Sequence, residues 1–334
     1  MHEDRVIDIE LSYDKQYYAT AAKDGKVLFC DFSTNEILNT IEYHVDKVIS
    51  QLSISYDNKF LAVGFSDGMI DIISLDDNFK KTLPPRKNAK LTLLKFVGYG
   101  HLLSATNEGE TLLWDTYSDN ASVKLLNDFT VSKSKVINTK INSNKNNIIA
   151  KLESNQLARW DIGQTKVVKY YEIGENMYSS DFLIQGGSKT SHIEYDTTLK
   201  FISTEETKII EPPSTSKWRN TPYDYYDFDI SPDGSKIAIV TNDNLVVIWN
   251  SNFTEKEVHI NCHDFRMNDI EFSNNGRYLA TSSIDKTLKI WDIYSGKLVN
   301  SIMLQKDWVT KIIFSDSTLI YGTYGGSIDF LPLD

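Results

Sequence analysis

The chain has little cysteine, little proline and no long apolar run. Two cysteines in 334 residues, Cys30 and Cys262, are too few for a disulfide framework or a cysteine-rich zinc site, so we expect both to be small buried apolar residues. Only 7 prolines accompany 41% hydrophobic residues, a composition that provides a sizeable core. No stretch approaches the roughly 18 apolar residues of a membrane span, and MHEDRVIDIE lacks the basic and apolar segments of a secretory signal. These absences predict a cytoplasmic or nuclear protein.

Positive charge is also scarce. Lysine and arginine number 35 against 46 acidic residues, which gives a net charge of −11. Binding of nucleic acid over the whole surface needs clustered cations facing phosphates, so this balance argues against it. The charge balance is still compatible with a local basic patch.

One pattern recurs along the chain: a strand with small hydroxyl residues, a tight turn that carries an acid, and a strand that ends in Trp-Asp. Its clearest copy is LATSSIDKTLKIWD, residues 279–292. Related stretches at a period of roughly 42 residues end at Asp31, Ser74, Asp115, Asp161, Ser203, Asn250 and Pro332, the one at Ser203 being the poorest. Each follows an alternating strand with a polar turn, such as FDISPDGSK, and most precede a further strand, such as KLVNSI. The pattern indicates four short strands per unit and no long helix.

These motifs resemble those of the WD-repeat family of β-propellers, and the resemblance runs from Arg5 to Leu331. It implies an all-β fold: one β-propeller of four-stranded antiparallel blades over residues 1–334. We expect eight blades, with seven as the alternative if the weak fifth unit is an insertion. Their approximate ranges are 5–41, 47–83, 90–126, 135–171, 178–211, 225–260, 267–303 and 309–334. Either the last blade has three strands and the ring closes by blade packing, or the chain is a piece of a longer protein.

The resemblance also implies a hydrogen-bonded network within a blade, built from a His, a hydroxyl, the turn Asp and the Trp. In the seventh repeat these are His263, Thr281 or Ser283, Asp285 and Trp291. His44 is equally well placed and His2 is a further candidate. Because fragments of the set recur, we interpret it as structural and not as a catalytic triad. Where Cys30, Ile73, Ile202 and Leu331 replace the Trp, we expect apolar packing to hold the blade.

In this family the residue before the first strand of a blade lies on the rim of the top face. We read these positions as Arg5, Lys47, Lys90, Lys135, Asp224, Arg266 and Trp308, five of which are cations. An electropositive ring on an acidic chain would steer anionic ligands, and Arg pairs well with carboxylate or phosphate. Exposed lysine and arginine also simply keep a protein soluble. Trp308 is a candidate anchor for a partner or packs on a neighbouring loop.

The stretch 209–229 is the longest irregular segment and is rich in Pro, Ser and aromatic residues. Long loops in compact domains are often functional. Trp218, Arg219, Tyr223 and Tyr225 are therefore candidates for a second contact patch, or they cover the weak fifth blade.

The function that this pattern predicts is a non-enzymatic scaffold or peptide-recognition module that binds acidic or phosphorylated protein segments on the top face. It would act alone or as the sensor or targeting part of a larger regulatory protein, without cofactor, metal or membrane. The alternatives are nucleic-acid binding through the basic ring and, ranked last, a hydrolase. The sequence contains no Gly-rich phosphate loop, no His-Glu-x-x-His and no Gly-x-Ser-x-Gly, which argues against common chemistries.

Overall fold

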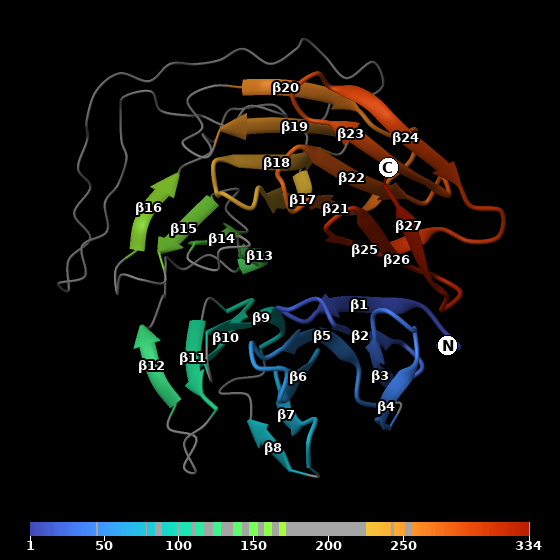
Figure 1. Ribbon diagram of the computed structural model, residues 1–334. Helices are drawn as coiled ribbons and strands as arrows, with labels where there is room; N and C mark the ends of the chain where they lie inside the picture. Colours follow the sequence, from blue (N-terminus) through green and yellow to red (C-terminus); the bar gives the residue numbers. More distant parts are fainter. Residues whose placement is uncertain are drawn as a thin grey trace. The chain divides into compact units, whose positions relative to one another are not determined.

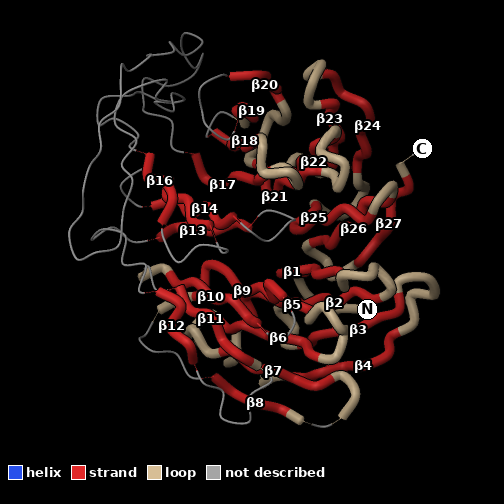
Figure 2. The backbone as a smooth tube through the Cα atoms, turned by 60° about the vertical axis from the view of Figure 1, so that its left-hand side comes forward, coloured by secondary structure: helices blue, strands red, loops and turns tan. Residues whose placement is uncertain are grey.

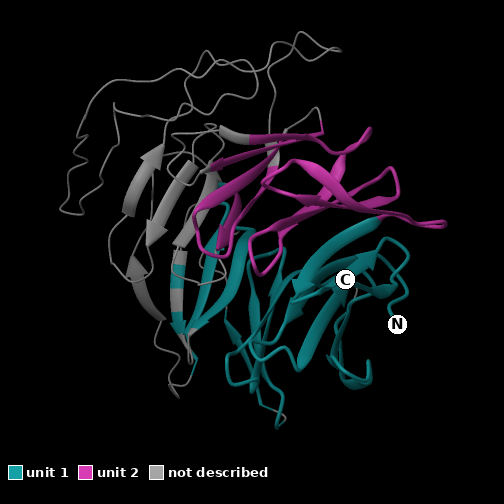
Figure 3. Ribbon diagram, turned by 45° about the horizontal axis from the view of Figure 1, so that its top comes forward, with its two compact units in different colours: residues 1–136, 309–334 teal, residues 137–308 magenta. Residues whose placement is uncertain are grey.

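The computed structural model describes residues 1–44, 46–77, 79–83, 89–98, 101–108, 111–116, 123–127, 136–141, 147–152, 157–161, 167–171, 225–241, 244–250 and 256–333. Every regular element in these ranges is a β-strand (Figure 2). The chain forms two compact units, one of residues 1–136 with 309–334 and one of residues 137–308 (Figure 3). We call them unit 1 and unit 2.

Unit 1 contains three four-stranded sheets and one three-stranded sheet, each an antiparallel meander whose neighbours follow one another in sequence (Figure 1). The first sheet is formed by Val6–Leu11 (β1), Tyr17–Ala22 (β2), Lys26–Asp31 (β3) and Ile37–Glu42 (β4). The second is formed by Ile49–Ile54 (β5), Phe60–Phe65 (β6), Ile70–Ser74 (β7) and Lys80–Leu83 (β8). The third is formed by Leu91–Gly98 (β9), His101–Thr106 (β10), Thr111–Asp115 (β11) and Val123–Asn127 (β12). The three-stranded sheet is formed by Val309–Ser315 (β25), Thr318–Thr323 (β26) and Ile328–Pro332 (β27).

Unit 2 contains three further four-stranded sheets with the same meander order. The first is formed by Val136–Ile141 (β13), Asn147–Leu152 (β14), Leu157–Asp161 (β15) and Val167–Tyr171 (β16). The second is formed by Tyr225–Ile230 (β17), Lys236–Thr241 (β18), Leu245–Asn250 (β19) and Lys256–Asn261 (β20). The third is formed by Met267–Phe272 (β21), Tyr278–Ser283 (β22), Thr287–Asp292 (β23) and Lys297–Met303 (β24).

Turn chemistry sets where these strands end. Gly25 lies in the Asp-Gly turn between β2 and β3 with a φ of +80°, a conformation that side chains with a Cβ rarely adopt. A Cβ at this position would lie 2.7 Å from the carbonyl oxygen of Tyr43. The turn therefore requires glycine for both its dihedral angle and its close backbone contact.

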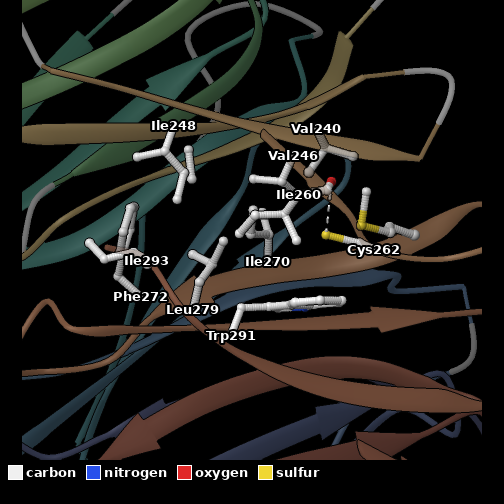
Figure 4. Close-up of a cluster of buried hydrophobic side chains, with 12 residues drawn as sticks. Val240, Val246, Ile248, Ile260, Cys262, Ile270, Phe272, Leu279, Trp291 and Ile293 are labelled. Atoms are coloured by element: carbon white, nitrogen blue, oxygen red, sulfur yellow. Dashed lines mark hydrogen bonds between the residues drawn. The ribbon is translucent and has the colours of Figure 1, made fainter. Parts of the chain in front are cut away.

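Apolar side chains of consecutive sheets pack together. In unit 2 one buried cluster joins Val240 and Val246 of the β17–β20 sheet to Ile270, Leu279 and Trp291 of the β21–β24 sheet (Figure 4). Burial of each large side chain stabilises the folded state by about 1.5–3 kcal/mol, so this packing holds the two sheets together. Cys262 belongs to this cluster, and both cysteines are free and buried.

Apolar packing also stabilises a sheet that lacks the Trp. Ile73 of β7 lies at the Trp position and contacts an apolar cluster of the first two sheets, which contains Phe29, Leu52 and Phe65. Apolar contact thus takes the place of the polar network in this sheet.

Polar groups on the first strands link neighbouring sheets at regular intervals. The backbone N–H of Leu52 donates to Asp8 Oδ2 over 2.8 Å, and that of Phe272 donates to Asp229 Oδ2 over 2.7 Å. Phe96 donates in the same way to Ser53 Oγ over 2.9 Å. Because the partners are 43 or 44 residues apart, these bonds repeat with the sequence period.

The sheet of β25–β27 packs against the first sheet of unit 1. Thr310 Oγ1 donates to the carbonyl of Val6 over 2.8 Å, across 304 positions of sequence. Gly322 lies against Val6, where a Cβ would come within 2.5 Å of Val6 Cγ1. Phe330 completes the contact with edge-to-face rings at Tyr18 and Phe32. Early and late parts of the chain therefore form one core.

The expected all-β fold with four-stranded antiparallel units is confirmed, and the described strands begin and end within about two residues of the predicted ranges. The predicted unit 178–211 lies outside the described residues, so the number of blades and the single-domain boundary stay predictions. The last described sheet has three strands, and both expectations for how the chain ends stay predictions.

Candidate interaction site

The network expected in the seventh repeat is present in the β21–β24 sheet. Trp291 Nε1 donates to Thr281 Oγ1 over 2.9 Å, and His263 Nε2 lies 2.8 Å from the same oxygen. His263 Nδ1 lies 2.9 Å from Asp285 Oδ2. A consistent proton arrangement has the Thr281 hydroxyl donating to Nε2 and a neutral His263 donating from Nδ1 to Asp285. Ser283, the alternative hydroxyl, instead donates to the backbone carbonyls of Phe265 and Arg266.

Electrostatics keep this network in one protonation state. Burial lowers the pKa of His263 from its usual 6.5, although Asp285 opposes the shift. Burial alone would raise the pKa of Asp285, but hydrogen bonds from Thr287 and the proximity of His263 hold it below its usual range. The imidazole is therefore neutral and the carboxylate ionised near pH 7. The arrangement fixes the turn between β22 and β23.

The first sheet of unit 1 carries the same set without the Trp. His2 Nε2 lies 2.8 Å from Thr20 Oγ1, and its Nδ1 lies 3.1 Å from Asp24 Oδ2. Cys30 stands where the Trp would be. The β9–β12 sheet has the bond between the Trp and the hydroxyl but no His at this site: Trp114 Nε1 donates to Ser104 Oγ over 2.8 Å. Recurrence in separate sheets makes these residues structural.

His44 was expected to be as well placed as His263, and this was wrong. Its side chain is 81% exposed, and Nδ1 lies 2.8 Å from Asp46 instead of reaching the turn acid Asp67. The β6 residue that corresponds to Thr20 and Thr281 is Val63, which has no hydroxyl. Without that partner, burial of the imidazole would leave a polar nitrogen unsatisfied.

The residues at several rim positions accept equivalent backbone hydrogen bonds. Arg5, Lys90 and Arg266 directly precede β1, β9 and β21, and their carbonyls accept from the N–H groups of Lys23, Asn107 and Ile284. Trp308 directly precedes β25 and is half-buried. In β5 the matching carbonyl belongs to Val48, which accepts from Ser66. Lys47 therefore lies one residue before the rim position, and an exposed apolar residue occupies it.

The cations at these positions differ in their exposure to solvent. Lys47 Nζ lies 3.4 Å from Asp67 Oδ2 and 5.5 Å from the centre of the Phe65 ring, so its charge is partly neutralised. Arg5 is half-buried, whereas Lys90 and Arg266 are exposed. Lys135 lies outside the described residues.

Sequence reasoning missed an apolar contribution around Arg266. Phe265 is 59% exposed, and Ile284 is exposed beside it in the neighbouring turn. Ser283 Oγ contacts the carbonyls of Phe265 and Arg266 at 3.0 and 2.9 Å, and Ile284 N–H donates to Arg266. We call Phe265, Arg266 and Ile284 the Arg266 patch. The signal in the sequence is Phe265 itself, an aromatic residue within a polar turn.

The second predicted patch is only partly described. Trp218, Arg219 and Tyr223 lie outside the described residues, and Tyr225 is the first residue of β17. In the described ranges no three or more His, Cys, Asp or Glu side chains gather in a way that would hold a metal ion. The same ranges contain no helix long and apolar enough to cross a membrane.

Comparison with a solved structure defines the class of the fold. The chain aligns over 100% of its length with 99% of the β-propeller domain of Cps50 (Swd1) from Myceliophteria thermophila, with a TM-score of 0.69 and 14% sequence identity. The fold is therefore a β-propeller. Residues 255–292 match the family described as "WD domain, G-beta repeat", and residues 9–83 match the "Anaphase-promoting complex subunit 4 WD40 domain". These two stretches of the chain are therefore similar to WD repeats.

Curated relatives share parts of this sequence. The chain is similar to the transcriptional corepressor LEUNIG_HOMOLOG of Arabidopsis thaliana, at 30% identity over 139 residues, which covers 42% of this chain and 17% of that protein. It is also similar to nuclear distribution protein PAC1-2 of Postia placenta, at 43% identity over 42 residues, covering 13% and 10%. COMPASS component SWD3 of Saccharomyces cerevisiae is 32% identical over 101 residues, covering 29% of this chain and 32% of that protein. The matched stretches thus span less than a third of each relative.

Proposed function

We propose that this β-propeller protein is a non-enzymatic interaction module that binds an acidic or phosphorylated segment of a partner protein. Contact is made at the Arg266 patch of unit 2, where the first strand of the β21–β24 sheet begins. The Arg266 patch carries the proposal: on a hydrogen-bonded turn, an exposed arginine follows the exposed Phe265 in sequence, and its carbonyl accepts from the N–H of the exposed Ile284. Such a surface offers bidentate pairing with carboxylate or phosphate together with an apolar contact.

Rigidity supports this assignment. Ser283 and the Ile284 N–H hold the backbone at Phe265 and Arg266, so a ligand would not need to order that turn. A pre-organised surface keeps more of its contact energy as affinity. Arg5 and Lys90 occupy the equivalent position in their own sheets of unit 1.

The relatives favour assembly with other proteins over catalysis. One is named a component of COMPASS and another a transcriptional corepressor, which favours a multi-protein complex and, of the two expected compartments, the nucleus. The networks that resemble catalytic groups hold strand turns in this chain. We therefore propose that the module works without cofactor or metal.

Peptide binding to the Arg266 patch tests the proposal. A library of acidic and phosphoserine peptides is selected against the wild type, and the selected peptides are titrated against Arg266→Glu. We expect a loss of about tenfold or more in affinity, as for loss of one charge-assisted bidentate contact. Arg277→Glu is the matched control, because Arg277 is exposed in the turn at the other end of the same sheet, paired with Asp292.

Two results would contradict the proposal. Equal losses in both variants would show that only overall charge matters. Selection of no acidic peptide, with salt-dependent binding of oligonucleotides instead, would favour the nucleic-acid alternative.

A further inference from the structure

Two tyrosines from neighbouring sheets of unit 1 stack on each other at the surface. Tyr13 lies in the turn between β1 and β2, and Tyr56 lies in the turn between β5 and β6. The centres of the two rings are 4.5 Å apart, and the ring planes are tilted by 31°. Tyr13 is nevertheless 65% exposed. One face of its ring therefore lies against Tyr56, and the other face is open to solvent.

Polar contacts link the turns that carry this pair. Ser12 Oγ donates to Asp14 Oδ1 over 2.7 Å and shapes the turn between β1 and β2. Asn58 Nδ2, from the turn between β5 and β6, donates to Asp14 Oδ2 over 2.7 Å. Lys15 forms an ion pair with Asp316 of the turn between β25 and β26. Three turns of unit 1 are thus tied together, so a ligand would not have to order the tyrosines.

The backbone of these turns is strained where they are linked. Lys15 and Asn58 have φ angles of +59° and +58°. The equivalent residues in two turns of unit 2 are Gly234 and Gly276, whose N–H groups donate in the same way to the serine three residues earlier. Glycine adopts this left-handed conformation freely, whereas a residue with a Cβ is strained in it. Unit 1 therefore carries strained side chains where glycine would fit, and strain of this kind gathers at functional sites.

Carboxylates lie next to both tyrosines in sequence. Asp14 follows Tyr13, and Asp57 follows Tyr56. Partial burial alone would raise the pKa of Asp14, but hydrogen bonds within and between the turns hold it below its usual value. Asp14 is exposed and, with this low pKa, ionised at pH 7. The open face of Tyr13 thus has a negative charge on the adjacent residue.

These charges select among the ligands that a tyrosine ring can take, which are a nucleic-acid base, a proline and a cation. The three turns, residues 12–16, 55–59 and 315–318, contain three acids and two lysines. One of these lysines, Lys15, is already paired. An acidic surface repels the phosphates of nucleic acid and adds nothing to contact with a proline. A guanidinium gains from both groups, because it stacks on an aromatic face and pairs with a carboxylate.

We propose that Tyr13 and Asp14 bind an arginine in an extended basic segment of a partner protein. The guanidinium stacks on the open face of Tyr13 and pairs with the carboxylate of Asp14. Tyr56 holds the ring from the other side. This surface lies where β1 ends, whereas the rim position Arg5 lies where β1 begins. It is therefore a second binding surface, and its ligand has the opposite charge to that of the Arg266 patch.

Selection from a randomised library of short peptides on the full chain tests this proposal. Peptides that bind the wild type are titrated against Tyr13→Ala, and we expect those that lose affinity about fivefold or more to contain arginine. Citrulline in place of that arginine keeps the shape of the side chain without its charge and should cause a loss of the same size. Tyr13→Phe keeps the aromatic face and should bind as the wild type does.

Two further variants test the contribution of the carboxylate. Asn275 stands at the position of Asp14 in the β21–β24 sheet and accepts the same bond from Ser273 Oγ over 2.8 Å, so an asparagine fits this turn. Asp14→Asn should therefore keep the turn, lower the affinity for the arginine peptides about threefold or more, and weaken the dependence of binding on salt. Asp233→Asn removes the equivalent charge in a turn of unit 2 that has no tyrosine, and it should leave binding unchanged.

Tyr294→Ala is the matched control for the loss of an exposed tyrosine. Tyr294 is 69% exposed in the turn between β23 and β24, but Lys236 Nζ lies 5.6 Å from the centre of its ring. A cation of the chain itself already contacts that ring, so its removal should not change peptide binding.

The proposal is overturned if selection recovers no peptide whose affinity falls in Tyr13→Ala, or if the peptides that depend on Tyr13 contain no arginine. Equal binding by Asp14→Asn and the wild type overturns it as well, and so does loss of binding in Tyr13→Phe. Binding of a single-stranded oligonucleotide that is lost in Tyr13→Ala would assign this face to nucleic acid instead.

Discussion

At the scale of single residues, the hydroxyl of Thr281 satisfies two buried partners at once. It accepts from Trp291 and lies within hydrogen-bond distance of His263. The comparison with β6 shows the effect of losing this hydroxyl. Val63 occupies the position that corresponds to Thr281, and the side chain of His44 is exposed to solvent. A buried donor and acceptor without their shared partner cost more than the bond itself contributes.

Thr281→Val should therefore lower the free energy of unfolding by about 2–4 kcal/mol, because it leaves the indole N–H and the imidazole nitrogen unpaired. Urea unfolding followed by tryptophan fluorescence measures the change. Ser282→Ala is the control at the next position, since Ser282 Oγ is buried without a hydrogen-bond partner among the described residues. Its removal should leave stability unchanged or raise it. Equal losses in both variants would contradict the role of the network.

Asp229 gives the folded protein a pH dependence of its own. Burial raises the pKa of this carboxyl from 3.8 to about 6, although Lys140 and the Phe272 N–H oppose the shift. Because the folded state holds the proton more tightly than the unfolded chain, its stabilising contribution is complete below about pH 4 and is lost as the pH rises through 6. Asp229→Asn does not titrate. The stability of the wild type relative to this variant should fall by on the order of 1–3 kcal/mol between pH 4 and 7.

A second carboxyl in the same sheet is the control. Burial alone would raise the pKa of Asp233, but hydrogen bonds from Ser231 and Ser235 hold it below its usual value. Its contribution therefore grows as the pH rises, and Asp233→Asn should show the opposite slope. A pH-independent difference between the wild type and Asp229→Asn would contradict the raised pKa.

At the scale of elements, strand positions could be predicted because their causes are local. Alternating apolar residues and Asp-Gly or Asn-Gly turns define each strand, and the predicted range 267–303 matches β21–β24. The rim position in the second sheet could not be read in this way, because Val48 and Lys47 are distinguished by which carbonyl accepts from Ser66. Exposure of Phe265 and Ile284 depends on the packing of neighbouring elements, which a local pattern does not contain.

The contact between β26 and β1 is tight enough to test by a mutant cycle. Gly322→Ala places a methyl group within 2.5 Å of Val6 Cγ1, so it should destabilise unit 1 by about 1–3 kcal/mol. Val6→Ala makes room for that methyl group. In the double variant, thermal unfolding should show a smaller loss than the sum of the two single losses. Additive losses of stability in the double variant would contradict a direct steric contact between positions 6 and 322.

At the scale of the whole molecule, the last strands are part of the first core. β25 and β26 supply Thr310, Ile320 and Gly322 to the contact with Val6 and Ile9. Removal of residues 309–334 would expose this apolar surface of β1. We expect the truncated chain to lose cooperative unfolding and to aggregate, as measured by circular dichroism and light scattering. A truncated chain that stays monomeric with an unchanged melting temperature would contradict this expectation.

The bond between Thr310 and Val6 has a consequence for synthesis on the ribosome. Unit 2 is contiguous in sequence, from residue 137 to 308, whereas unit 1 needs residues separated by 304 positions. Closing so long a loop costs entropy and slows folding. The face of β1 in the nascent N-terminal sheets therefore stays uncovered until residues 309–334 have been translated. During that interval the exposed apolar face of β1 favours aggregation, and chaperones or rapid translation of residues 309–334 would limit it.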